Sequence, residues 1–220
     1  MTPTHCLEIK NLSLSRGGRR LLKGLNFKLN AGEWLHLQGD NGIGKTSLLR
    51  VICSLAPLDE GEVLWNSEDI HQDLTRYLKD IFFVGHKIAL KEELSPYENL
   101  TIECALMNVP VERVQLLEAL KHFGLQGREH VPLGILSQGQ KRRVGLAKLK
   151  LSRAPLWILD EPLVALDAHT VEKFTELLEN HLANSGMIVL TSHQPITLNG
   201  RGRVLTLTLW THLSQFCDAI

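Results

Sequence analysis

A glycine-rich loop near residue 40 is the part of this sequence best suited to chemistry. It reads Gly39-Asp40-Asn41-Gly42-Ile43-Gly44-Lys45-Thr46, the spacing G-x-x-x-x-G-K-T, and Ser47 follows it. Residues 33–38 predict a strand before the loop, and residues 45–54 predict a helix after it. Glycines let backbone N–H groups surround a phosphate at a helix N-terminus, Lys45 can reach the β- and γ-phosphates, and the Thr46 hydroxyl can bind Mg²⁺. The alternative is a plain turn with a stray lysine, but the flanking strand and helix favour phosphate binding.

Two carboxylates close a short apolar run later in the chain. Residues 156–159 predict a buried strand, and Asp160 and Glu161 follow it. Ligands of α/β sheets bind at the carboxyl ends of the strands, which would place this pair beside the glycine loop. Asp160 would then bind Mg²⁺, and Glu161 could deprotonate a water that attacks the γ-phosphate. An acidic helix cap is the alternative, and the pair alone does not decide between them.

A third candidate is the segment Leu136-Ser137-Gln138-Gly139-Gln140 at the start of a predicted helix. Ser137, Gly139 and Gln140 at a helix N-terminus could hold an anion, and a second copy of the chain could bring them to the same phosphate. A simple serine N-cap is the alternative. The basic residues that follow predict a solvated face rather than a nucleic-acid surface, because no aromatic residues interleave with them. They are Arg142, Arg143, Lys148 and Lys150.

The elements that position these residues change in character along the chain. Residues 7–66 are strand-like with a single helix, and residues 96–151 have helical spacing with a break at 124–132. A strand at 156–159, a helix with the face Val171, Phe174, Leu178 and Leu182, and a strand at 187–190 follow. Short apolar strands alternating with helices predict a parallel sheet covered on both faces.

Composition excludes several classes of protein. The chain has 220 residues, and 24 Lys and Arg balance 24 Asp and Glu, so no net field draws it to nucleic acid or to an anionic bilayer. The beginning of the chain lacks the pattern of a signal peptide, and no stretch approaches the roughly 20 apolar residues that span a bilayer. Four scattered cysteines predict reduced thiols. We therefore expect a protein that is cytosolic or attached to a membrane from the cytosolic side.

Taken in this order, the three motifs resemble those of ABC transporter ATP-binding subunits, with Ala165-Leu166-Asp167 after the acidic pair and Ser192-His193 after the next strand. The resemblance covers about residues 7–195. It implies one α/β domain over residues 1–220, a P-loop NTPase of ABC type. This fold would have a mostly parallel sheet with flanking helices, an N-terminal antiparallel β subdomain and a helical insert over about 88–151. It also implies that His193 contacts the γ-phosphate of ATP, and that two copies sandwich two ATP molecules with Mg²⁺. Each site would pair one copy's loop with the Ser137 segment of the other copy.

Further residues resemble the haem-exporter ATPases of the bacterial cytochrome c maturation system. They are Val84-Gly85-His86, Leu94, Glu98-Asn99-Leu100, the segments 136–144 and 156–162, His193-Gln194 and Trp65. That family works with separate integral membrane subunits at the inner membrane, and uses ATP hydrolysis in releasing haem from a periplasmic chaperone. The resemblance therefore implies a peripheral subunit on the cytoplasmic face, linked to haem only through its complex and not to nucleic acid.

Three positions depart from the usual ABC pattern. His86 stands where most members have a Gln that contacts Mg²⁺ or water and touches the membrane partner. The haem-exporter group tends to have this His. The alternative is a His that caps the end of a strand. Gln138 replaces a Gly or Ala, which affects how the segment packs on phosphate. Arg16 takes the place of the aromatic ring that stacks on adenine, and its guanidinium could stack there instead, with weaker or less selective contact.

Two other functions fit part of the pattern. A P-loop kinase would use the glycine loop and the acidic pair on a small-molecule hydroxyl, but has no use for the Ser137 segment. A non-transport ABC protein acting on ribosomes or DNA usually has two ATP domains or a long coiled coil, and residues 39–136 contain no heptad array.

Overall fold

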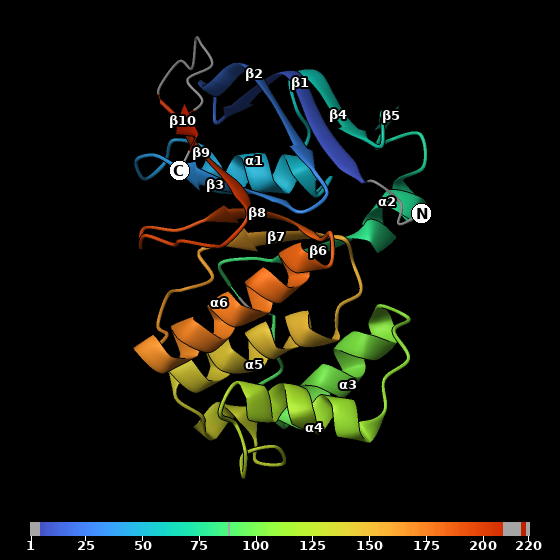
Figure 1. The fold of residues 1–220 in the computed structure, drawn as a ribbon, viewed down its shortest axis with the longest axis vertical. Coiled ribbons are helices and arrows are strands. Elements are labelled where there is room, and N and C mark those ends of the chain that lie inside the picture. The colour runs from blue at the N-terminus through green and yellow to red at the C-terminus, as the bar shows by residue number, and fades with distance from the viewer. Residues whose placement is uncertain (1–4, 88, 209–216, 219–220) are drawn as a thin grey trace. The chain divides into compact units, whose positions relative to one another are not determined.

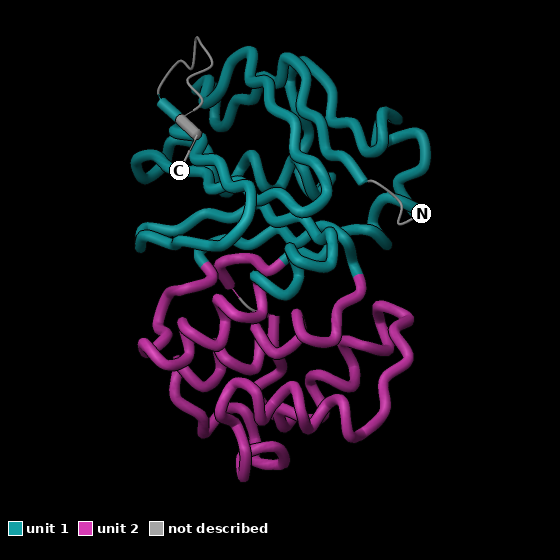
Figure 2. Tube along the Cα trace, viewed as in Figure 1, with its two compact units in different colours: residues 1–83, 154–161, 179–220 teal, residues 84–153, 162–178 magenta. Residues whose placement is uncertain are grey.

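The computed structural model describes residues 5–87, 89–208 and 217–218. The chain divides into two compact units, shown in different colours in Figure 2. Unit 1 comprises residues 1–83, 154–161 and 179–220, and unit 2 comprises residues 84–153 and 162–178. The single domain over 1–220 with a helical insert over about 88–151 stays a prediction, and its bounds 1, 88 and 220 lie outside the described residues.

Unit 1 contains an antiparallel sheet with the strand order β2-β1-β4-β5. Its strands are β1 (Cys6–Arg16), β2 (Arg19–Asn30), β4 (Glu60–Trp65) and β5 (Glu68–Asp69). Leu7 and Ile9 of β1 are buried, as the alternation of a half-buried strand requires. Gly17 and Gly18 both have positive φ, which fits the tight turn between β1 and β2. This sheet is the predicted antiparallel β subdomain.

The second sheet has the order β10-β9-β3-β8-β7-β6. Its strands are β3 (Glu33–Gln38), β6 (Ile81–Val84), β7 (Leu156–Asp160), β8 (Met187–Thr191), β9 (Arg201–Thr206) and β10 (Cys217–Asp218). Pairing is parallel from β7 through β8 and β3 to β9, and antiparallel between β9 and β10. Every residue of β7 and β8 is buried, which explains why both strands are continuous apolar runs.

The core of unit 1 fills the space between the two sheets. Helix α1 (Lys45–Ile52) lies there (Figure 1), with Leu48 and Leu49 fully buried. Helix α2 (Leu74–Asp80) begins at an Asp73 cap, and its Tyr77 hydroxyl donates to the Ile52 carbonyl at 2.8 Å. Because α1 packs against both sheets, its N-terminus, where the glycine loop ends, is held in a fixed position in unit 1.

Unit 2 is helical. Its elements are α3 (Pro96–Leu106), α4 (Arg113–His122), a 3₁₀ turn (Leu133–Ile135), α5 (Gln138–Leu151) and the first part of α6 (Ala168–Ala183), which continues into unit 1. Helix α3 begins at a reciprocal cap between Ser95 and Glu98, and α5 begins at one between Ser137 and Gln140. None of the helices in the described part of the chain has the length and apolar character needed to cross a membrane.

Candidate functional site

The glycine loop joins β3 to α1 and leaves a helix N-terminus open. Gly44 is the N-cap of α1 and has no side chain to cap it, and the first turn contains no acidic residue. Unpaired N–H groups and the positive end of the helix dipole therefore face outward, as a phosphate requires.

Glycine is required at both ends of this loop. Gly39 has φ of 139°, and a Cβ atom there would lie 2.6 Å from the Leu207 carbonyl oxygen. Gly44 has φ of 113°, and its Cβ would lie 3.2 Å from Leu21. Leu21 belongs to β2, so the hairpin that carries the exposed Arg16 packs against the loop.

The Lys45 ammonium lies against the same loop. Its side chain is buried, and Nζ donates to the carbonyl oxygens of Gly39 and Asp40, at 3.1 Å for Asp40. Carbonyl oxygens are weaker partners for an ammonium than an anionic oxygen is. Lys45 is thus held where an arriving phosphate could exchange for these two contacts.

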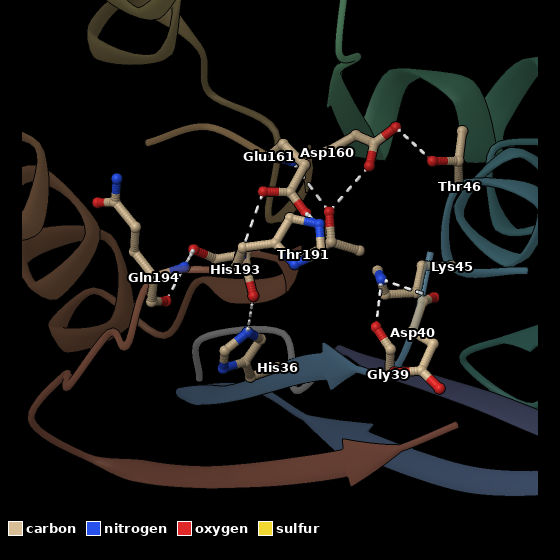
Figure 3. A network of polar contacts seen from close by, with 11 residues as sticks. His36, Gly39, Asp40, Lys45, Thr46, Asp160, Glu161, Thr191, His193 and Gln194 are labelled. Carbon is tan, nitrogen blue, oxygen red and sulfur yellow. Dashed lines mark hydrogen bonds and ion pairs between the residues drawn. The ribbon is translucent and has the colours of Figure 1, made fainter. Parts of the chain in front are cut away.

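Asp160 ends β7 within reach of the helix that follows the loop (Figure 3). Thr46 Oγ1 donates to Asp160 Oδ2 at 2.9 Å, and Thr191 Oγ1 donates to Asp160 Oδ1 at 2.8 Å. Mg²⁺ is usually held by one or two carboxylates together with substrate phosphates. The described residues contain no cluster of three or more His, Cys, Asp or Glu side chains that could form a complete metal cage. A hydroxyl and a carboxylate next to a phosphate loop therefore fit Mg²⁺ that arrives with a nucleotide.

Glu161 follows with an uncommon backbone conformation. Its φ is 52°, in the left-handed region, which costs on the order of 1 kcal/mol for a non-glycine residue. Its amide donates to Thr191 Oγ1 at 2.9 Å. Its carboxylate accepts from the His193 amide at 3.2 Å and lies 3.5 Å from His193 Nε2. The His193 side chain is 57% exposed, so it is open to a ligand. A carboxylate and an imidazole therefore meet at the carboxyl ends of β7 and β8.

Two residues of this network were not identified from the sequence. Thr191 is fully buried and is the register partner of Asp160 across the parallel pair of β7 and β8. His36 of β3 is 2% exposed, and its Nε2 lies 3.1 Å from the Ser192 carbonyl oxygen. Burial lowers the pKa of His36, and Lys45 adds to that effect, while the Ser192 hydrogen bond and Glu161 oppose it. His36 has apolar neighbours in β3, and Thr191 ends the apolar strand β8, which marks both as unusual, but only the pairing of the strands shows what they contact.

Unit 2 contains the Ser137 segment. Ser137 Oγ accepts from the Gln140 amide at 3.2 Å, and the Ser137 amide donates to Gln140 Oε1 at 2.9 Å. A Cβ atom on Gly139 would lie 3.0 Å from the Ala165 carbonyl oxygen, so the helix start and the 165–167 loop approach closely. The segment is a capped helix N-terminus, as both interpretations of the sequence require.

His86 also belongs to unit 2. It is exposed, and its carbonyl oxygen accepts from Arg142 Nη1 at 3.1 Å. Arg142 also donates to the carbonyl oxygens of Gly85 and Pro162, both at 3.4 Å. A cavity of about 390 Å³ lies beside these residues, with Gln138 and Ala165 in its lining.

The prediction of a solvated basic face on α5 is wrong for two of its four residues. Arg142 and Lys148 are each 7% exposed. Arg142 binds backbone carbonyls, and Lys148 Nζ pairs with Glu103 Oε1 at 2.6 Å. Helix α5 packs against α3 and α4, and each of these buried cations has oxygen partners that compensate for its lost hydration.

Comparison with known sequences finds similar proteins that share one name. A model of the ABC transporter family matches residues 22–164. The cytochrome c biogenesis ATP-binding export protein CcmA of Albidiferax ferrireducens is 44% identical over 192 residues, which are 87% of this chain and 91% of that protein. The protein of the same name from Dechloromonas aromatica is 46% identical over 87% of this chain and 94% of its own length. That from Escherichia coli K12 is 43% identical, over 87% and 91%.

Solved structures agree with the sequence relatives. An ABC transporter ATP-binding protein from Pyrococcus furiosus has a TM-score of 0.79 at 27% identity, covering 92% of this chain and 97% of that one. A dimeric ATP-binding cassette in a post-hydrolysis state with ADP and phosphate also has a TM-score of 0.79, at 25% identity over 96% and 98%. The predicted fold class and the resemblance drawn from the motifs are confirmed.

Proposed function

This chain belongs to the ABC transporter family and, within it, to the ATP-binding export proteins of cytochrome c biogenesis, and from that membership we propose that it hydrolyses ATP to drive membrane-embedded partners in haem export. One observation carries the proposal. Thr46, Asp160, Glu161 and His193 form one connected polar network beside an uncapped helix N-terminus.

In this proposal the glycine loop binds the triphosphate of ATP. The backbone of residues 39–47, including Ser47, surrounds the phosphates, and Lys45 leaves its carbonyl partners to contact the β- and γ-phosphates. Thr46 and Asp160 would hold Mg²⁺, which when bound neutralises charge on the β- and γ-phosphates. Arg16, on the hairpin beside the loop, stacks on the adenine. His86 is proposed to contact Mg²⁺ or a water near it.

Glu161 is the proposed general base. Its carboxylate would accept a proton from the water that attacks the γ-phosphorus, while His193 contacts the γ-phosphate. The Glu161 backbone is fixed by Thr191, and its carboxylate is oriented by the His193 amide. These contacts hold the base in one orientation before ATP arrives, which reduces the reorganisation needed during reaction.

A second copy of the chain is the proposed source of Ser137, Gly139 and Gln140 at the same γ-phosphate. The dimeric relative in a post-hydrolysis state supports such an arrangement. ATP would then hold two copies together, and hydrolysis would release them. Reversing a population from 1:99 to 99:1 takes about 5.5 kcal/mol, which several charge-assisted hydrogen bonds to one phosphate can supply.

Integral membrane subunits are the proposed partners that use this motion. The relatives are named as export proteins, although the described part of this chain has no membrane-spanning helix. The chain is proposed as a peripheral subunit on the cytoplasmic face of the inner membrane, with haem handled by its partners. The exposed His86 loop and the cavity beside it are the expected contact for a membrane subunit.

Three variants test the proposal. Glu161→Gln should bind ATP, accumulate as an ATP-dependent dimer and lose hydrolysis by a factor of about 10² to 10⁴. The control Glu62→Gln changes an exposed glutamate on β4 in the same way and should match wild type. Ser137→Arg should bind ATP as a monomer but lose dimerisation and turnover.

The measurements are equilibrium ATP binding, phosphate release and sedimentation with and without ATP. Wild-type hydrolysis in Glu161→Gln would refute the assignment of the base. Loss of ATP binding by the Ser137→Arg monomer would show that this segment does not act from a second copy.

A further inference from the structure

His36 lies beneath the segment that carries His193 and is used by none of the roles above. It stands in the middle of β3, three residues before Gly39, and is 2% exposed. A buried polar side chain in a strand of apolar neighbours loses its hydration and must recover it through hydrogen bonds.

The two partners of His36 define its tautomer. Nε2 lies 3.1 Å from the Ser192 carbonyl oxygen, which can only accept, so Nε2 must carry the proton. Nδ1 lies 3.3 Å from Nε2 of Gln38 and accepts from that amide. The ring is therefore neutral and connects Gln38, the last residue before the glycine loop, to the segment that precedes His193.

The peptide group between Ser192 and His193 is held at both of its edges. Its carbonyl oxygen accepts from His36, and its N–H donates to Glu161 Oε2 at 3.2 Å. A peptide group is planar, so two such contacts on opposite edges fix its rotation. Figure 3 shows His36 and Glu161 on opposite sides of the His193 segment. The Ser192 hydroxyl adds a local turn by donating to the Gln194 carbonyl and accepting from the Gln194 amide.

We propose that His36, supported by Gln38, is a positioning residue that clamps the Ser192–His193 peptide and so orients both the His193 ring and the Glu161 carboxylate for hydrolysis. This inference rests on the proposed function, since it assumes the roles given there to Glu161 and His193. Without the clamp, the peptide can rotate, and Glu161 loses the donor that orients its carboxylate. The effect falls on the chemical step, because His36 has no contact with the phosphate-binding backbone of residues 39–44 among the described hydrogen bonds.

Two substitutions separate positioning from general stability. His36→Phe keeps a buried ring and removes both hydrogen bonds. It should lower kcat about tenfold, which is a change of 1.36 kcal/mol in the barrier. The Kd for ATP should stay within about twofold of wild type. His36→Gln restores a donor for the Ser192 carbonyl and an acceptor for Gln38, and should bring kcat within about threefold of wild type.

His122→Phe is the matched control. His122 Nε2 also meets a backbone carbonyl, that of Lys173 at 3.2 Å, but it lies on α4 of unit 2. Removing this bond should leave kcat within about twofold of wild type. Phosphate release and equilibrium ATP binding are measured for each variant in the full chain with its membrane partners.

Several outcomes would overturn the inference. They are wild-type kcat in His36→Phe, an equal loss of kcat in His36→Gln, or a loss confined to ATP affinity. The Glu161→Gln variant distinguishes a failure of this inference from a failure of the proposed function. If Glu161→Gln is inactive while His36→Phe is fully active, the inference fails and the proposed function stands. If His36→Phe does not fold, the ¹⁵N chemical shifts of the His36 ring in the wild-type protein test the proposed hydrogen bonds instead. They must report the neutral Nε2–H tautomer, and a charged ring or the Nδ1–H tautomer refutes the clamp.

Discussion

The free energy of unfolding should fall steeply in acid because of one buried histidine that packs against β7, the strand that ends at Asp160. His181, in the last turn of α6, stacks on Trp157 of β7 with ring centroids 3.7 Å apart and planes 6° from parallel. The ring also lies directly against Gly186, since a Cβ atom there would lie 2.4 Å from it. Within the described residues its Nε2 has no hydrogen-bond partner, and burial outweighs the backbone of Met187 and Pro155, which favours the charged ring.

The size of the effect follows from the pKa of His181. Burial lowers this pKa from 6.5 to about 4. The unfolded chain therefore binds the proton more readily than the folded chain between these two values. The folded state keeps this contribution in full above pH 6.5 and loses it as the pH falls toward 4. The loss in the free energy of unfolding is about 2 kcal/mol at pH 5 and about 3 kcal/mol in total.

Urea unfolding of wild type and His181→Phe, at neutral pH and at about pH 5, measures this contribution. Phenylalanine keeps the stack on Trp157 and cannot titrate, so wild type should lose about 2 kcal/mol more than the variant on acidification. His169→Phe is the control, because its side chain is 74% exposed and should leave the pH dependence of wild type unchanged. Parallel pH profiles for wild type and His181→Phe would refute the reasoning.

Two further changes test contacts that the sequence did not reveal. Thr191→Val removes the hydroxyl that links the Asp160 carboxylate to the Glu161 amide, and should lower the free energy of unfolding by about 1–3 kcal/mol and slow ATP turnover. Thr101→Val removes an exposed hydroxyl bond and should do neither. Lys148→Met breaks a mostly buried ion pair and should cost about 1–3 kcal/mol in urea unfolding, whereas Lys141→Met, whose partner Glu92 is 63% exposed, should cost less than about 1 kcal/mol. Equal effects within either pair would contradict the burial argument.

Local patterns predicted the elements that position the candidate site. The glycine loop has its strand before it and α1 after it, and both apolar runs are the strands β7 and β8. These signals are short-range, since glycine spacing and apolar runs are fixed by neighbouring residues. Helix α1 ends at Ile52 rather than at the predicted Ser54. Ser54 has φ of 54°, and Leu55 donates back to Arg50, so the helix closes with a left-handed residue that is not the usual glycine.

Polar residues that act across the sheet could not be placed in the same way. Thr191 lies opposite Asp160 only because β7 and β8 pair in parallel with that register. His36 lies beside the Ser192 carbonyl because β3 is the neighbour of β8 on its other side. A shift of one residue in either pairing would turn these side chains to the opposite face. Register depends on the whole sheet, so no window of sequence around Thr191 or His36 contains it.

The strained backbone at Glu161 shows why these unpredicted contacts are needed. A glycine would adopt its φ of 52° without cost, but it would remove the carboxylate proposed as the base. The chain keeps the glutamate, and two residues hold it through three contacts: Thr191 at its amide, and the amide and ring of His193 at its carboxylate. The two hydrogen bonds, from the Glu161 amide and from the His193 amide, contribute about 1 kcal/mol each, enough together to offset the strain. If they were weakened one at a time, the carboxylate would lose its orientation before the fold lost its stability. We therefore expect variants at these supporting positions to lower turnover more than they lower the melting temperature.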